Sequence, residues 1–145
     1  MPFVSVTRLR VRFLRFLPGF FLDAMRTQRQ VAAAPGFVAG SLLPDRRWTF
    51  WTLTLWDSSD DMRAYITTGA HRVAMPKLMQ WCDEASIVHW DQAATTLPSW
   101  TEAEARMRGE GRPSKVRHPT ADHLAMTFAP ARMGSGTRIA PRRTS

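Results

Sequence analysis

Residues 48–56 carry the clearest strand pattern in the chain. Aromatic and β-branched residues dominate this segment, and such residues suit the pleated surface of a sheet. Neighbouring side chains of a strand point to opposite faces, so Trp56 lies on one face and Trp51 on the other. Because both faces carry apolar bulk, the pattern predicts a strand that is covered on both sides.

The rest of the first 91 residues can be divided by the same criterion and by apolar residues at three- and four-residue steps. The predicted elements are a strand over 3–12, a helix over about 20–32, strands over 37–43 and 48–56, helical pieces over about 62–66 and 70–82, and a strand over 86–90. Only a short turn separates the two middle strands, which predicts an antiparallel hairpin.

This β-α-β-β-α-β order predicts an α+β fold of the ferredoxin-like type, with both helices on one face of an antiparallel four-stranded sheet. The opposite face then lacks a helical cover, although the central strands are apolar there. An open apolar face of that size favours association. We therefore expect a homodimer in which two sheets pack face to face.

The first predicted strand has two different faces. Arg8, Arg10 and Arg12 share one face, which predicts that the second half of the strand extends past the sheet. Ser5 and Thr7 lie on the other face among apolar residues. Small hydroxyl side chains there are typical of a cavity lining, and Thr is also a common residue of ordinary strands.

Length and charge divide the chain into a domain over 1–91 and an extension over 92–145. Residues 1–91 hold 11 Lys and Arg against 8 Asp and Glu, while residues 92–145 hold 9 against 4. We expect one short helix after Trp100, with Thr101 as its cap and Trp100 as an anchor, order to about 120, and disorder beyond. The basic extension suits nucleic acid, an anionic membrane, or plain solvation.

Other features restrict the class of protein. The single cysteine, Cys82, excludes an internal disulfide framework and fits a cytoplasmic location. An acidic neighbour disfavours the thiolate, so Cys82 is predicted to be buried and unreactive. No apolar run approaches the roughly 20 residues of a membrane helix. The scattered glycines form no nucleotide-cofactor fingerprint.

The order of elements resembles the dimeric α/β barrel superfamily, as do the segments Leu53-Thr-Leu-Trp-Asp-Ser58, Met62-Arg-Ala-Tyr65 and Gly69-Ala-His71. This group includes antibiotic-biosynthesis monooxygenases, haem-degrading monooxygenases and spheroidene monooxygenase, and the last is nearest in pattern. The resemblance covers about residues 3–91 and implies a cavity between sheet and helices. At the positions of the Asn, Trp and His of haem-degrading members, this chain has Thr7, Tyr65 and His71.

His71 and Tyr65 are the candidate catalytic residues. An imidazole can shuttle protons or ligate a metal near neutral pH, so His71 would act as acid and base or, if haem binds, as its ligand. The Tyr65 hydroxyl would donate to a substrate oxygen, or the side chain lies at the core edge. A lone His is also often a structural hydrogen-bonding residue.

The candidate substrate-binding residues are Thr7, Ser5, Trp51 and Trp56, with the two indoles as flat pocket walls. The alternative is that the tryptophans fill the core and a dimer interface. His71 and His89 are too few for a metal site without carboxylates. Asp83 and Glu84, expected at the end of the second helix, are the acidic candidates.

Three hypotheses for function follow. The first is a small oxygenase-like enzyme that acts on a hydrophobic polycyclic or polyene substrate, with or without haem. The second is a non-catalytic module that binds or senses haem or another hydrophobic ligand in the same cavity. The third is a nucleic-acid-associated protein that uses the basic extension.

Overall fold

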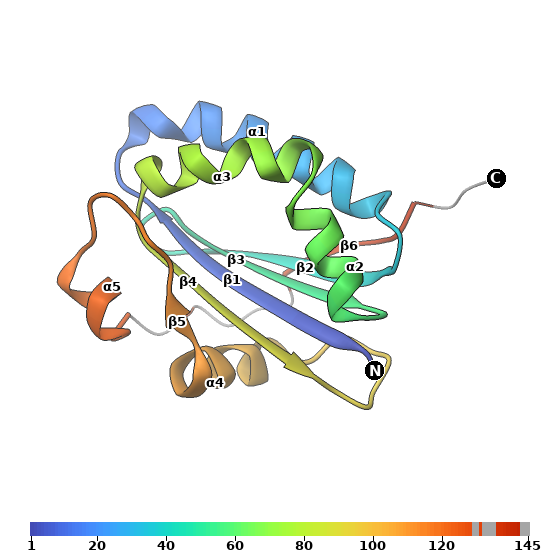
Figure 1. The fold of residues 1–145 in the computed structure, drawn as a ribbon. Helices are drawn as coiled ribbons and strands as arrows, with labels where there is room; N and C mark the ends of the chain where they lie inside the picture. Colours follow the sequence, from blue (N-terminus) through green and yellow to red (C-terminus); the bar gives the residue numbers. More distant parts are fainter. Residues whose placement is uncertain (129–130, 132–135, 143–145) are drawn as a thin grey trace.

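A computed structural model describes residues 1–128, 131 and 136–142, which form one antiparallel sheet with helices on both faces (Figure 1). The strands are β1 (Phe3–Val11), β2 (Phe37–Asp45), β3 (Thr49–Trp56), β4 (Cys82–Asp91), β5 (Arg112–Pro113) and β6 (Thr137–Ile139). The helices are the 3-10 turn η1 (Leu14–Phe16), then α1 (Leu17–Ala32), α2 (Ser59–Ile66), α3 (Gly69–Trp81), α4 (Trp100–Glu110) and α5 (Ala121–Ala125). No helix of these described residues is long and apolar enough to cross a membrane.

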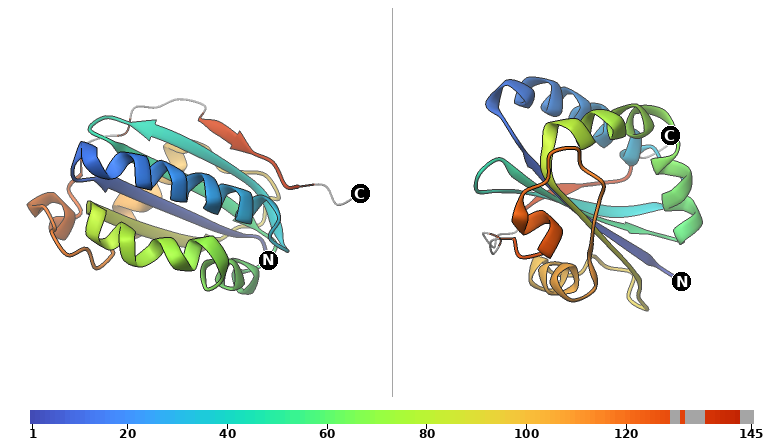
Figure 2. Two further views of the ribbon diagram at one scale, coloured as in Figure 1. Left: turned by 90° about the horizontal axis from the view of Figure 1, so that it is seen from above. Right: turned by 60° about the vertical axis from the view of Figure 1, so that its left-hand side comes forward.

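The ferredoxin-like plan is confirmed. The strand order is β5-β4-β1-β3-β2-β6, so the four predicted strands form the centre of the sheet. In the middle of this sheet, Val6 of β1 lies opposite Leu53 of β3 and Val88 of β4. Helices α1 and α3 lie side by side on one face, as the view from above shows (Figure 2).

Local sequence explains where the two helical pieces after β3 begin. The Ser58 hydroxyl accepts a hydrogen bond from the backbone N–H of Asp61 at 3.2 Å, and this cap starts α2 as predicted. The chain then turns through Gly69, whose φ of +60° suits glycine, and α3 begins. Pro76 lies inside α3 without ending it.

The second face of the sheet is covered by the chain itself. Helix α4 crosses below the sheet in Figure 1, on the side opposite α1 and α3. It buries Trp100, Ala103 and Met107 against the sheet, as part of one apolar cluster. The other members of this cluster include Val4, Val6, Leu43, Trp51, Leu53, Leu55, Val88, Trp90 and Phe128. The expectation of an uncovered face was therefore wrong, and it had been the physical reason for predicting a homodimer.

The extension differs from the sequence prediction in two further ways. Ser99 is the cap of α4, because its hydroxyl accepts from the backbone N–H of Glu102 at 3.1 Å, and Thr101 is the second residue of the helix. Trp100 is a buried anchor, as predicted. Disorder was expected after about residue 120, but the described residues there include α5 and β6, and β6 pairs with β2. Residues 129–130, 132–135 and 143–145 lie outside the description.

The arginines of β1 do not extend past the sheet, because β1 stays paired to β4 as far as Val11. Arg8 is buried and donates to Glu84 at 2.6 Å, while Arg10 donates to the other carboxylate oxygen at 2.9 Å. Glu84 and Asp83 both lie in β4, whereas the sequence analysis expected them at the end of the second helix. Thr120 also donates to Glu84, at 3.1 Å, so this carboxylate ties the extension to the sheet.

Replacing Trp100 with Ala is expected to lower the free energy of unfolding by about 3–5 kcal/mol, because a buried indole leaves a cavity between α4 and the sheet. Urea unfolding followed by circular dichroism measures this change. Ala105 lies on the exposed side of the same helix, and Ala105→Ser is expected to change stability by about 0.5 kcal/mol or less. Equal unfolding midpoints for the two variants would contradict the position of α4.

Candidate functional site

The face of the sheet below α1 and α3 carries a group of small hydroxyl side chains. Ser5 and Thr7 of β1 lie opposite Thr54 and Thr52 of β3, respectively. On the other side of β1, Ser5 lies opposite His89 of β4. The alternation of β1 and β3 therefore collects polar groups at the centre of a sheet that is otherwise apolar on this face.

These central residues are less buried than their position suggests. Thr7, Thr52 and Ile87 are only half-buried, although strands flank them on both sides and helices lie above. On the opposite face, Val6 and Leu53 are 0% and 1% exposed. Some accessible surface therefore remains on the helix-covered face at these three positions.

Aromatic rings gather at one end of this face, at the α2–α3 junction. The Tyr65 ring lies 5.3 Å from the Trp56 ring and 5.0 Å from the His71 ring, between centroids. The Tyr65 hydroxyl donates to the backbone oxygen of Thr27 in α1 at 3.3 Å. Burial raises the pKa of Tyr65 above its usual value, so its phenol stays protonated. The two predicted catalytic residues are thus in contact with each other, and Tyr65 also contacts Trp56.

The tautomer of His71 follows from its partner. Its Nδ1 lies 3.3 Å from the backbone oxygen of Ile66, which can only accept, so in the neutral ring the proton is on Nδ1. The Nε2 atom is then the basic nitrogen. Burial lowers the pKa of His71, against a smaller opposing effect of the Ile66 hydrogen bond. His71 is therefore a neutral base at pH 7, and Nε2 is the atom that can take a proton or a metal.

Gln30 positions this junction, and the sequence analysis did not identify it. Its side-chain amide donates to the backbone oxygens of Tyr65 at 3.0 Å and Thr68 at 2.8 Å. Its carbonyl oxygen accepts from the backbone N–H of His71 at 2.8 Å. Gly69 passes so close that an added Cβ would lie 3.1 Å from the Gln30 amide. Gln30 and His71 are 41 positions apart, and no local pattern indicates the contact.

A surface hollow of about 530 Å³ lies beside the same junction. It is lined by Ile66, Thr67, Arg72, Met75, Pro76 and Met79. Among these, the two methionines and Ile66 form an adaptable apolar surface. Neither Thr7 nor Trp56 lines this hollow, so it is a neighbouring feature of α2 and α3.

His89 is a second histidine on the helix-covered face. Its ring lies 5.2 Å from that of Phe3, and its Nε2 atom is buried without a hydrogen-bond partner among the described residues. Burial lowers its pKa, and the charges of Arg112 and Arg63 lower it further. His89 shares the face of Ser5, so it adds a neutral imidazole to the polar group there.

Trp51 is separated from the other predicted pocket residues. It points to the α4 face, where its ring lies 5.7 Å from Phe128 and 6.4 Å from Trp100. Its indole N–H donates to Asp45 at 3.2 Å. It belongs to the core on the α4 side, whereas Trp56 belongs to the core under α1 and α3, so the two indoles cannot line one cavity.

The described residues contain no group of three or more His, Cys, Asp or Glu side chains that could hold a metal ion. Glu84, one predicted acidic candidate, is occupied by Arg8 and Arg10. Although burial alone raises the pKa of Glu84, those two arginines lower it below its usual value. Cys82 is buried, as predicted, and burial together with the charge of Asp83 raises its pKa to about 12, which disfavours the thiolate.

Solved structures of similar fold come from several bacteria. SnoaB, described as a cofactor-independent oxygenase from Streptomyces nogalater, is 21% identical, with a TM-score of 0.53 over 68% of this chain and 98% of its own. A putative antibiotic biosynthesis monooxygenase from Nitrosomonas europaea is 15% identical, with a TM-score of 0.56 over 63% and 99%. Another from Caulobacter crescentus is 18% identical, with a TM-score of 0.56 over 64% and 91%.

These likenesses show the fold, an antibiotic-biosynthesis-monooxygenase-like arrangement of sheet and helices. The solved chains are matched almost completely, yet about a third of the present chain lies outside each match. No curated protein matches the chain. A family model described as a domain of unknown function, DUF3291, matches residues 14–115, which is more than half of the chain. The chain therefore belongs to the DUF3291 family.

Proposed function

We propose that this protein is a small oxygenase-like enzyme that binds a flat, hydrophobic substrate between the sheet and helices α1 and α3. The observation that carries the proposal is the pairing of accessible surface at Thr7 and Thr52 with a neutral imidazole at one end of the same space. An apolar site with a few converging polar groups is the usual form of a small-molecule site. The oxygenase descriptions of similarly folded proteins agree with it.

Each residue of the proposed site has a separate role in the proposed reaction. The Nε2 atom of His71 would remove a proton from an acidic C–H or O–H group of the substrate, which leaves an electron-rich anion that molecular oxygen can oxidise. Tyr65 would hold the His71 ring in place, and its protonated hydroxyl is the predicted donor to a substrate oxygen. Ser5 and Thr7 would hydrogen-bond polar groups of the ligand. Trp56 is fully buried behind Tyr65, so it would support the Tyr65 ring and not face the ligand as the predicted flat wall.

The nature of the substrate remains a prediction. The proposed site lies on the face that carries Phe3 and Ile87, and such apolar side chains suit a polycyclic ring system or a polyene better than a sugar or a nucleotide. The sequence pattern is nearest to that of spheroidene monooxygenase, and this resemblance favours a polyene substrate. It is likewise a prediction. If haem binds, the Nε2 atom of His71 would hold its iron, and the iron would supply oxygen activation.

The other functional hypotheses receive less support. A non-catalytic module would use the same space, and only an activity measurement separates it from an enzyme. Nucleic-acid binding through the extension is weakened by α4, where Arg106 and Arg108 form ion pairs with Glu102, Glu104 and Glu110. Their positive charges are thus balanced within one helix.

Replacing Thr7 with Phe is expected to weaken binding of anilinonaphthalene sulfonate, a flat apolar probe, at least about tenfold, because the ring fills the space under the helices. Fluorescence titration measures the affinity. Thr127 is exposed, and Thr127→Phe adds the same bulk outside the space. If both variants bind the probe as the unmodified protein does, the site lies elsewhere.

Replacing His71 with Ala is expected to abolish oxygen uptake with an electron-rich hydroquinone substrate and, if haem is used, the Soret band of added haemin. His118→Ala, at an exposed histidine, is the matched control and should retain both. Since the pKa of His71 is lowered, uptake by the unmodified protein should persist below the ordinary histidine pKa of about 6.5. Haemin binding without oxygen uptake would support the non-catalytic module instead.

The homodimer remains a prediction, now without its original reason, because α4 occupies the face through which two sheets were expected to pack. Light scattering during gel filtration tests it. A monomer has a mass of 16.5 kDa. If the unmodified protein is a dimer, its subunits must associate through another surface. A monomer would agree with α4 as the cover of that face.

A further inference from the structure

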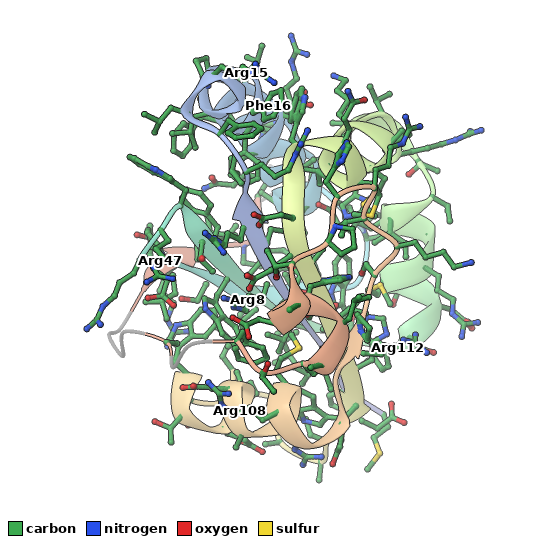
Figure 3. All side chains as sticks on the ribbon, turned by 90° about the vertical axis from the view of Figure 1, so that its left-hand side faces the viewer. Arg8, Arg15, Phe16, Arg47, Arg108 and Arg112 are labelled. Carbon is green, nitrogen blue, oxygen red and sulfur yellow. The ribbon has the colours of Figure 1, made fainter. Side chains whose placement is uncertain are left out.

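Four segments far apart in the sequence meet at one end of the molecule. The end of β1 is joined to the β2–β3 hairpin by a hydrogen bond from Val11 N–H to the Trp48 oxygen at 3.0 Å. Arg12 N–H donates to the Trp81 oxygen at the end of α3 at 2.7 Å, and Arg117 N–H donates to the Met79 oxygen at 3.0 Å. Residues 12–16, 46–48, 79–81 and 114–119 are therefore neighbours. Figure 3 looks onto this end.

This end concentrates positive charge. It carries six cationic residues, namely Arg12, Arg15, Arg46, Arg47, Lys115 and Arg117, here called the basic end. The segments 12–16, 46–48 and 114–119 that supply them contain no acidic residue. Arg15 and Arg47 extend outward in Figure 3, from separate elements. The sequence had suggested that the positive charge is concentrated in the extension, but the fold brings four arginines of the first domain together with two cations of the extension.

Large apolar side chains are interleaved with these cations. Phe13, Leu14 and Trp48 are 48%, 62% and 48% exposed. Arg12 and Arg15 each lie about 5 Å from the centre of the Phe13 ring. Phe21, Leu22 and Met25 of the following helix α1 are exposed as well. A soluble chain rarely exposes so many large apolar residues together without a partner for them.

The hairpin tip that presents Trp48 has an unusual backbone. Arg47 and Trp48 have φ angles of +57° and +58°, in the left-handed region that favours glycine, and no glycine occupies the turn. A bulky side chain in this region carries a conformational cost, and such cost is found most often at functional positions. The turn keeps Arg47 and Trp48 next to each other at the surface.

We propose that the basic end docks on the surface of a membrane that contains anionic lipids. Guanidinium and ammonium groups match lipid phosphates, while Trp, Phe and Leu side chains favour the boundary between headgroups and acyl chains. Charge complementarity identifies the partner as anionic, and the aliphatic Leu14 and Leu22 favour acyl chains over nucleic-acid bases, which stack on aromatic rings. The proposal does not depend on the catalytic role of His71.

Binding to vesicles that mix phosphatidylglycerol with phosphatidylcholine, measured by co-sedimentation of the full chain, tests the proposal. The unmodified protein should bind these vesicles and not pure phosphatidylcholine. Arg46→Gln combined with Arg47→Gln should weaken binding roughly tenfold or more, since each cation near an anionic surface contributes several-fold. The same charge change at Arg63→Gln with Arg138→Gln, two exposed arginines outside the basic end, should alter binding less than about twofold.

Fluorescence adds a readout that a purely electrostatic contact would not give. Trp48 is the most exposed tryptophan, so its insertion should shift the emission to shorter wavelength on vesicle addition, and Trp48→Ser should remove that shift. Thermal unfolding of each variant checks that the fold is kept. Equal binding to both vesicle types, equal weakening by the two double variants, or retention on single-stranded DNA without vesicle binding would overturn the proposal.

Discussion

The structure depends on one constraint, which is that its central sheet is apolar on both faces. Val4, Val6 and Leu55 on one face are fully buried, and so is Trp56 on the other. Each face needs a cover, because exposed apolar area of this size would favour aggregation. Helix α4 with Phe128 covers the face of Val4, Val6 and Leu55, and helices α1 and α3 cover the face of Trp56. The extension is therefore part of the folded unit and not an appendage to it.

The cover formed by α4 and the cover formed by α1 and α3 pack differently against the sheet. The α4 side is packed closely, with Trp51, Met107 and Ala103 almost without exposure. Within the sheet, Arg8 and Glu84 form a buried ion pair, and Thr120 of the extension donates to this carboxylate at 3.1 Å. A buried ion pair is costly to desolvate, so its value here is in giving the extension a specific polar partner on the sheet. The α1 and α3 side keeps accessible surface at Thr7 and Thr52, and this is the layer in which we propose that a ligand binds.

Much of the candidate site was predictable from local patterns. Alternation correctly placed Ser5 and Thr7 on the helix-covered face, and the resemblance pointed to Tyr65 and His71, which are in contact. Three parts were not predictable. The junction depends on Gln30, Trp51 belongs to the α4 core, and Arg8 is paired with a residue 76 positions away. Each of these is a contact between distant segments, which hydrophobic periodicity does not encode.

The sequence by itself determined the element order, the α+β plan and the two-sided apolar character of the sheet, because alternation and helical spacing are properties of neighbouring residues. Only the tertiary structure decided what covers the second face. Either a second copy of the chain or an internal helix can bury this apolar surface. Which of the two does so depends on the path of the chain after Asp91. The same holds for the basic end, where cations from positions 12 to 117 become neighbours only once the strands have paired.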